Sequence, residues 1–267
     1  MNNRPIGIFD SGVGGLTVVR AVLEHLPQED IIYYGDTARF PYGPRDLAEV
    51  REYVFQIAAY LIDQGVKIII LACNTGTAAG LAEAQKAFNI PIIGVVEPGV
   101  RGAALATVNR KVGVIGTQGT IASGTYQRAL AAYDAGIRVT ARACPRFVEF
   151  AQRGEVEGPA IETVATEYLA PLRDAGVDTV ILGCTHYPLL AGVIGRALGP
   201  DVKLISSATE TATEVEENLI RRGHLRQKNG GPSHRFIVSG DEAAFQDLIA
   251  LFLGRNADNV EKVVLGE

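Results

Sequence analysis

The sequence predicts an α/β fold made of two pseudo-symmetric α/β domains whose sheets are mainly parallel. Continuous runs of β-branched residues recur along the 267 residues, and stretches with helical periodicity lie between most of them. Such runs are typical of parallel strands that helices cover on both faces. The composition agrees, because hydrophobic residues make up 47% of the chain and aromatic residues only 7%. Ligand sites in such sheets form beyond the carboxyl ends of the strands, so the residues after each strand matter most.

In the first part of the chain, the sequence predicts strands that are followed by polar, glycine-rich loops. The strands are the apolar runs PIGIF near residue 5, IIYYG near 31, KIIILA near 67 and PIIGVV near 91. Helices are expected over residues 44–64 and 75–88, where apolar residues recur at helical spacing. The loops that follow the first three strands contain DSGVGG, GDTARFPYG and CNTGT.

The later part of the chain continues this alternation and echoes the first part. Strands are expected at KVGVIG near 111, IRVTA near 137, DTVILG near 178, VKLI near 202, RFIVSG near 235 and KVVL near 262, and helices over 156–174 and 207–222. GIFDSGVGG resembles GVIGTQGTI at an offset of 106, and VKIIILACNTGTAA resembles VDTVILGCTHYPLL at an offset of 111. The two matches predict a duplication in which each half presents a cysteine just after a strand.

Charge and composition exclude several classes of protein. The net charge of −5 argues against a nucleic-acid-binding protein. A basic cluster is interpreted as a solvated helix end; it consists of Arg221, Arg222, His224, Arg226 and Lys228. No apolar run approaches the roughly 18–20 residues that cross a bilayer, and the N-terminus lacks the features of a signal peptide. We therefore expect no membrane association, a cytoplasmic location and free thiols.

Cys73 and Cys184 are the candidate reactive groups. Cys73 precedes Asn-Thr, which are good N-cap residues, and Cys184 precedes Pro188, which suits a first helical turn. A thiol that faces a helix N-terminus has a lowered pKa, so both are expected to be partly thiolate near neutral pH. The alternative is that both are inert core residues, because free cysteine is among the most buried residue types. Their recurrence in both halves favours the reactive interpretation.

Two thiols that face each other across a cleft suit racemisation at an α-carbon. The reaction removes a proton from one face and delivers one to the opposite face, which a single base does not easily reach. The carbanion must also be stabilised in a site closed to water. One cysteine has to be thiolate while the other is thiol, so activity is expected to follow a bell-shaped pH profile in each direction.

The loop that starts at Asp10 and Ser11 is predicted to bind an anion through backbone donors, with Asp10 beside an ammonium or the thiol. Nucleotide binding is an alternative, but a GxGxxG fingerprint needs a third glycine where Thr17 stands. A capping Asp in a tight turn is the other alternative. The stiff turn around Tyr42 is expected to present backbone N–H groups to a ligand, although loops with Pro and Gly usually only connect elements.

The second half offers matching polar groups. His186, two residues after Cys184, is expected to orient or protonate that thiol, although such a histidine is often structural. Thr117 and Thr120 take the place of Ser11 and either bind a carboxylate or cap a helix. Cys144, before Pro145, is interpreted as structural.

No cofactor and no metal are expected. Pyridoxal phosphate enzymes need a Schiff-base lysine, whereas Lys67, Lys111 and Lys203 stand at strand starts, away from the predicted site. The four His and three Cys show no spacing typical of a metal site.

Taken together, these segments resemble the glutamate racemase family, which supplies D-glutamate for bacterial peptidoglycan. The likeness rests on GIFDSGVGGLTV, GDTARFPYG, ACNTGTA, GVIGTQGTI, ACPRFVEF and LGCTHYPLL, which occur in family order across residues 6–190, and on HRFIVSGDEAAF further on. Each motif is moderately specific, and the ordered set is much more so. The resemblance implies residues 1–97 with 208–267 as one domain, 98–207 as the other, and the active site in the cleft between them.

The resemblance also implies roles for individual residues. Cys73 would take the proton from D-glutamate with the help of Asp10, and Cys184 would take it from L-glutamate with the help of His186. The implied substrate contacts are Asp10, Ser11, Tyr42, Gly43, Asn74, Thr75, Thr117, Thr185 and His186. Family members commonly form homodimers.

Two positions depart from the family pattern. Family members often carry a glutamate that assists the first cysteine, in a segment resembling FVPLVE, but this chain reads FVEFAQ and has Gln152 there. Glu149, one helical turn earlier, is the candidate substitute. The motif ACNTGTA stands where ACNTASA is commoner, a change between small residues.

Three other interpretations stay open at this point. The chain could racemise aspartate or another acidic amino acid. It could be a non-catalytic, two-lobed protein that binds an acidic metabolite, in which case the cysteines are incidental. It could be a thiol redox protein, which predicts a disulfide between Cys73 and Cys184 on mild oxidation.

Overall fold

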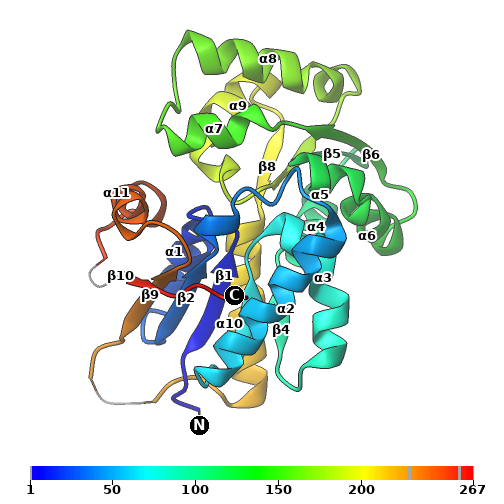
Figure 1. Cartoon of the computed structure of the whole chain (residues 1–267). Helices are drawn as coiled ribbons and strands as arrows, with labels where there is room; N and C mark the ends of the chain where they lie inside the picture. Colours follow the sequence, from blue (N-terminus) through cyan, green and yellow to red (C-terminus); the bar gives the residue numbers. More distant parts are fainter. Residues whose placement is uncertain (1, 228–229, 258–259, 267) are drawn as a thin grey trace.

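The computed structural model describes residues 2–227, 230–257 and 260–266, which form two lobes with one parallel sheet each (Figure 1). The chain starts in the first lobe, crosses into the second after strand β4, and returns through helix α10 (Figure 1). The predicted α/β class is confirmed, and a strand lies at or next to each predicted run. No helix among these described residues is long and apolar enough to cross a bilayer.

The first lobe is built on a six-stranded sheet in the order β10-β9-β2-β1-β3-β4, with all neighbours parallel. Its strands are β1 (Ile6–Asp10), β2 (Ile31–Gly35), β3 (Ile68–Leu71), β4 (Ile92–Gly94), β9 (His234–Val238) and β10 (Val260–Lys262). One face packs against α2 (Leu47–Asp63) and α3 (Asn74–Ala87), and the other against α1 (Leu16–His25), α10 (Ser207–Arg222) and α11 (Glu242–Leu253). Successive residues of β2 serve opposite faces: Tyr33 packs in one core and Tyr34 in the other.

The second lobe is built on a four-stranded parallel sheet in the order β6-β5-β7-β8. Its strands are β5 (Lys111–Gly116), β6 (Arg138–Ala143), β7 (Thr179–Gly183) and β8 (Lys203–Ser206). One face packs against α4 (Val96–Ala106) and α6 (Thr125–Tyr133), and the other against α7 (Arg146–Gln152), α8 (Pro159–Asp174) and α9 (Ala191–Leu198). The short elements η1 (Thr37–Arg39), α5 (Gln118–Ala122) and η2 (Tyr187–Leu190) lie in the loops between strands and helices.

The two sheets share one topology, which explains the internal echo in the sequence. The order β2-β1-β3-β4 of the first lobe corresponds to β6-β5-β7-β8 of the second. In each lobe the first strand pairs with its successor on one side and with the third strand on the other. The crevice between the first and third strands is therefore a topological switch point, where ligands bind in open α/β sheets. Cys73 follows β3 and Cys184 follows β7, so each thiol stands at such a point.

The structure corrects the interpretation of the basic cluster. Arg221 and Arg222 are exposed at the end of α10, as expected, but Arg226 is buried. The Arg226 guanidinium lies 3.3 Å from the Asp30 carboxylate and donates to three backbone carbonyls. A neighbouring buried ion pair joins Lys67 to Glu29. These ion pairs and hydrogen bonds hold the segment after α10 against the amino ends of the strands of the first sheet. Lys228 lies outside the described residues.

Candidate active site

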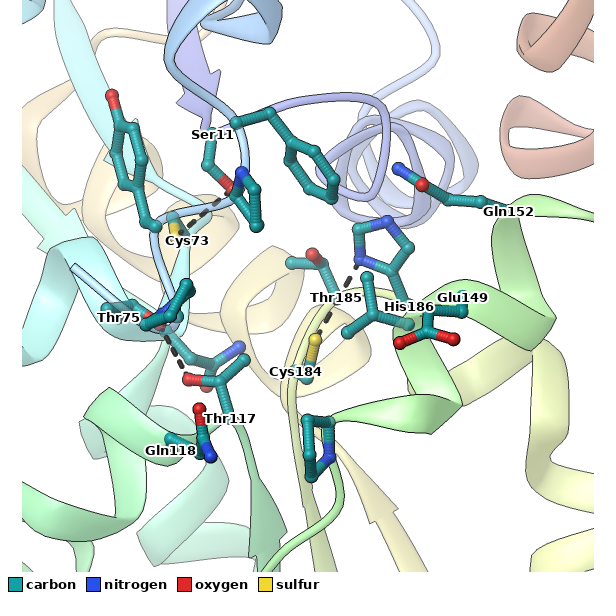
Figure 2. Close-up of a pocket in the computed structure, with 18 residues that line it drawn as sticks. Ser11, Cys73, Thr75, Thr117, Gln118, Glu149, Gln152, Cys184, Thr185 and His186 are labelled. Carbon is teal, nitrogen blue, oxygen red and sulfur yellow. Dashed lines mark hydrogen bonds between the residues drawn. The ribbon is translucent and has the colours of Figure 1, made fainter. Parts of the chain in front are cut away.

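A cavity of about 240 Å³ lies beyond the carboxyl ends of both sheets. It is smaller than the roughly 300–1,000 Å³ typical of pockets for drug-sized ligands, which suits a small metabolite. Loops of both lobes line it, and in Figure 2 Ser11 and Cys73 of the first lobe lie across from Cys184 and Thr185 of the second. The lining residues are Ser11, Phe40, Pro41, Tyr42, Gly43, Pro44, Cys73, Asn74, Thr75, Thr117, Gln118, Pro145, Val148, Glu149, Gln152, Cys184, Thr185 and His186.

The structure therefore brings both candidate thiols and all but one of the expected contact residues to one cavity. The exception is Asp10, which is fully buried beneath the cavity and does not line it. The cavity also has members that the sequence did not single out, among them Phe40, Gln118 and Val148. Phe40 belongs to the loop GDTARFPYG, and Gln118 follows Thr117. Their nearness in sequence to these motifs is the feature that could have indicated them as cavity residues.

Cys73 follows β3 after one intervening residue and is itself the N-cap of α3. The Gly76 N–H donates to its sulfur at 3.4 Å, so the cap is the thiol rather than the expected Asn74 or Thr75. The Cys73 sulfur also lies 3.7 Å from the Ser11 hydroxyl oxygen (Figure 2). The thiol thus faces the cavity from a fixed strand end, with a backbone donor directed at it.

Asp10 is held below Cys73 by its own loop. The N–H groups of Gly12 and Gly15 donate to Asp10 Oδ2 at 3.2 and 3.0 Å. The predicted anion-binding loop therefore binds its own carboxylate, as in the capping alternative. Burial raises the pKa of Asp10, while its backbone hydrogen bonds and its interaction with the Cys73 thiol lower it in part. The net upward direction makes Asp10 a better proton acceptor than an exposed aspartate.

Cys184 has a different neighbour. Its sulfur lies 3.8 Å from His186 Nδ1 (Figure 2). The next elements along the chain are the short 3-10 helix η2 and then α9. The His186 ring packs edge-on against Phe252 of α11 at a centroid distance of 5.2 Å. Complete burial lowers the pKa of His186 to about 4. The imidazole is therefore neutral at physiological pH.

The pKa values of both thiols differ from the sequence expectation. Burial raises the pKa of Cys73 to about 12, and the Asp10 charge raises it further, while the Gly76 N–H lowers it. Burial likewise raises the pKa of Cys184 above its usual value. The expected helix-terminus donor is present at Cys73, but removing the thiols from water outweighs it. Burial therefore favours the protonated thiol form of both cysteines near neutral pH.

Among the polar side chains in the rest of the cavity, most are uncharged. The hydroxyl oxygens of Thr75 and Thr117 lie 2.9 Å apart across the two lobes, and each contacts Thr120. Among the described lining residues, none is Lys or Arg. An anionic ligand would therefore be held by hydroxyl, amide and backbone donors. Thr117 also caps α5 through its hydroxyl, so binding and capping are compatible roles.

The loop that carries Tyr42 is anchored from below. The Tyr42 hydroxyl donates to the buried Asp36 carboxylate, which also accepts from Arg39 Nε at 2.7 Å and from the Ser239 hydroxyl at 2.7 Å. At the loop's end the Gly119 N–H donates to the Gly43 carbonyl at 2.8 Å. Gly43 thus joins the first lobe to the second through its carbonyl, and that contact uses an acceptor rather than the expected donor.

Two further residues of the cavity come from α7. Gln152 is half-buried, and Glu149 is largely exposed although it borders the cavity. Neither side chain forms a hydrogen bond to another described residue. Cys144 is buried outside the cavity, which fits its structural interpretation. All three cysteines are free, and no group of three or more His, Cys, Asp or Glu in the described ranges has the arrangement of a metal site.

Comparisons with known proteins agree with this geometry. A family model described as Asp/Glu/Hydantoin racemase matches residues 14–215. The glutamate racemase of Corynebacterium diphtheriae is 51% identical over 262 residues, which cover 98% of each chain. A glutamate racemase isoform from Bacillus anthracis has a crystal structure with a TM-score of 0.94 at 41% identity, covering 98% of both chains. A glutamate racemase from Francisella tularensis, in complex with D-glutamate, gives a TM-score of 0.93 at 39% identity and the same coverage.

Proposed function

The chain is an amino-acid racemase of the Asp/Glu/hydantoin racemase family, and we propose that it interconverts L-glutamate and D-glutamate through Cys73 and Cys184. The observation that carries this proposal is the placement of the two thiols. They stand at equivalent switch points of two lobes with the same topology, and both line one small cavity. Two-base racemisation needs an acid/base group on each side of the α-carbon.

The proposed reaction moves one proton in each direction. From D-glutamate, the Cys73 thiolate removes the α-proton, and the electron pair of the C–H bond stays on the α-carbon. The Cys184 thiol then delivers its proton to the opposite face, which leaves L-glutamate and a Cys184 thiolate. The reverse reaction starts from that thiolate. No electron acceptor is needed, because the proton lost by substrate and the proton gained are balanced by the two sulfurs.

Substrate binding has to favour a thiolate that burial disfavours. The substrate ammonium brings a positive charge into the cavity, and a nearby opposite charge lowers a thiol pKa. Asp10, which interacts with the Cys73 thiol and has a raised pKa, is placed to accept its proton. His186 is neutral and 3.8 Å from the Cys184 sulfur, so we assign it a hydrogen-bonding role rather than a charged one.

The substrate carboxylates would be held by neutral donors. We propose contacts from Ser11, Tyr42, Gly43, Asn74, Thr75, Thr117, Thr185 and His186, all of which line the cavity. Preorganised hydroxyl and amide donors in a closed site stabilise negative charge that grows on a carboxylate as the α-proton leaves. Asp10 acts from below through Cys73 and not as a direct contact.

The domain and cellular assignments follow from the same resemblance. We take residues 1–97 with 208–267 as one domain and 98–207 as the other, because each range holds every strand of one sheet. We further propose that the product D-glutamate serves peptidoglycan synthesis in the cytoplasm. A homodimer is the assembly that the family suggests, and sedimentation equilibrium of the purified protein tests it.

The test is incubation with L-glutamate in deuterated water, with a chelator and without added cofactor. Circular dichroism follows the loss of chirality, NMR follows α-proton exchange, and L-aspartate is run in parallel. We expect racemisation and exchange with glutamate only. Activity on aspartate instead of glutamate would identify the chain as an aspartate racemase. A lack of exchange with either amino acid would exclude the proposed function and favour a binding protein.

A further inference from the structure

A buried tyrosine connects the neighbourhoods of the two thiols. Tyr126 lies on α6 of the second lobe and is completely buried. Its hydroxyl donates to Asn74 Oδ1 at 2.6 Å, and Asn74 is the first residue of α3 in the other lobe. The Ser207 hydroxyl lies 3.3 Å from the same phenol oxygen. The Tyr126–Asn74 hydrogen bond therefore joins the two lobes directly behind the cavity.

The Tyr126 ring also supports the strand end at Cys184. A Cβ atom built on Gly183 would lie 3.1 Å from Tyr126 Cε2. The ring consequently packs against the residue that precedes Cys184, while the hydroxyl contacts the residue that follows Cys73. Ring and hydroxyl are separate features of one side chain, so a single substitution to Phe removes the second and keeps the first.

The hydrogen bond sets the orientation of the Asn74 amide. Because Oδ1 accepts from Tyr126, the amide nitrogen Nδ2 is directed elsewhere, and it donates to none of the described residues. Asn74 lines the cavity together with both thiols. Burial raises the pKa of Tyr126, so its hydroxyl keeps its proton and stays a donor at every pH used for an assay. The amide nitrogen is thus presented as a donor to whatever occupies the cavity.

We infer that Tyr126 is a positioning residue for the racemisation proposed above: its hydroxyl fixes the Asn74 amide so that Nδ2 donates to a substrate carboxylate. This inference rests on the proposed function. A donor fixed before the reaction stabilises the negative charge that develops as the α-proton leaves, whereas a free amide has to be oriented at that moment. Tyr126 itself does not line the cavity and acts through Asn74.

A double-mutant cycle tests the inference with Y126F, N74A and the double variant. Removing one oriented donor lowers kcat about a hundredfold in comparable sites, so we expect N74A to lose about that much and Y126F at least about tenfold. If Tyr126 acts through Asn74, adding Y126F to N74A causes no further loss, because residues in one network are not additive. Tyr133, exposed on the same helix, gives the matched control Y133F, which we expect to keep full activity.

An NMR measurement separates this inference from the proposed function. The side-chain amide signal that disappears in N74A identifies Asn74, and we expect it to shift in Y126F and to stay in place in Y133F. Losses that multiply in the double variant, or an unmoved Asn74 amide signal in Y126F, would overturn the inference while leaving the racemase assignment intact. Failure of the wild-type chain to racemise glutamate would overturn the proposed function and the role of Tyr126 in it.

Discussion

The surroundings of Cys73 and Cys184 differ although the two strand ends that carry them correspond. Cys73 caps an α-helix, accepts from a backbone N–H and has the ionisable Asp10 beneath it. Cys184 leads into a 3-10 turn and has a neutral histidine beside it. The two lobes therefore share the position of the thiol and not the chemistry that supports it. A racemase requires proton transfer on both faces of the α-carbon, but the residues that assist the two thiols can differ.

One loop of the first lobe connects these two environments. Residues 12–15 bind the Asp10 carboxylate and also approach the second lobe closely. A Cβ atom on Gly14 would lie 2.5 Å from His186 Nδ1 and 2.3 Å from the Thr185 hydroxyl oxygen. Glycine is required there because any side chain would separate the loop from the Cys184 side. The two half-sites are thus assembled by direct contact rather than through the substrate alone.

The largest expected loss of activity comes from replacing either thiol, because a cysteine is the feature that the two half-sites share. We expect Cys73→Ser and Cys184→Ser each to lower racemisation by about 10⁴-fold, because a hydroxyl is a far weaker acid and its alkoxide is inaccessible. The remaining thiol can still remove and return the α-proton on its own face of the α-carbon. Cys73→Ser should exchange the α-proton of L-glutamate for deuterium without inversion, and Cys184→Ser that of D-glutamate, as followed by NMR.

Cys144→Ser is the matched control, because Cys144 is buried outside the cavity and should leave turnover unchanged. The assignment of faces would be wrong if Cys73→Ser exchanged D-glutamate and left L-glutamate untouched. Equal activity of all three serine variants would remove the thiols from the mechanism.

The second prediction compares Asp10, which assists Cys73, with His186, which assists Cys184. We expect Asp10→Asn to lower kcat/KM by about a thousandfold, as for loss of a general base, and His186→Asn by only about tenfold. Asp10 is ionisable and its raised pKa makes it a proton acceptor for its thiol, whereas His186 is neutral. Steady-state kinetics of both variants at one pH measure the difference, with the surface variant Asp134→Asn as control. Equal losses would mean that the two sides are supported equally.

Asp10→Asn should also move the pH profile. The Asp10 charge raises the pKa of Cys73, so removing that charge favours the thiolate. With D-glutamate as substrate, the acidic limb of kcat/KM should therefore shift toward lower pH in Asp10→Asn and stay in place in His186→Asn. A shift to higher pH would contradict the electrostatic relation between Asp10 and Cys73.

Much of this site could be predicted from local sequence because it lies on strand ends. The runs before Cys73 and Cys184 predicted β3 and β7, and parallel sheets place such ends at one edge. The internal echo predicted that the two ends correspond, which the matching strand orders confirm. Loops that follow β1, β2 and β5 line the cavity for the same reason.

What the sequence could not predict depends on contacts between distant segments. The thiol pKa values rise because the packing of the fold buries both sulfurs, and no local motif reports that burial. Tyr126 follows no strand and carries no motif, yet packing places its hydroxyl on Asn74, 52 residues away. The sequence groups Arg226 with a solvated helix end, but it is buried against the distant Asp30 carboxylate and Gln28 carbonyl and two nearby carbonyls.

The smallest expected effect concerns the stability of the Cys184 side in acid. Burial lowers the pKa of His186 to about 4, whereas in the unfolded chain it returns to its ordinary value of 6.5. Between these values the unfolded state binds more protons than the folded state, so stability falls as the pH drops through this window and is fully present above it. From pH 7.5 to pH 5 the loss is about 2 kcal/mol. Urea unfolding at both pH values measures it, and His186→Asn should lack this part of the pH dependence. If wild type and His186→Asn lose the same stability in acid, the buried imidazole on the Cys184 side is not neutral as described.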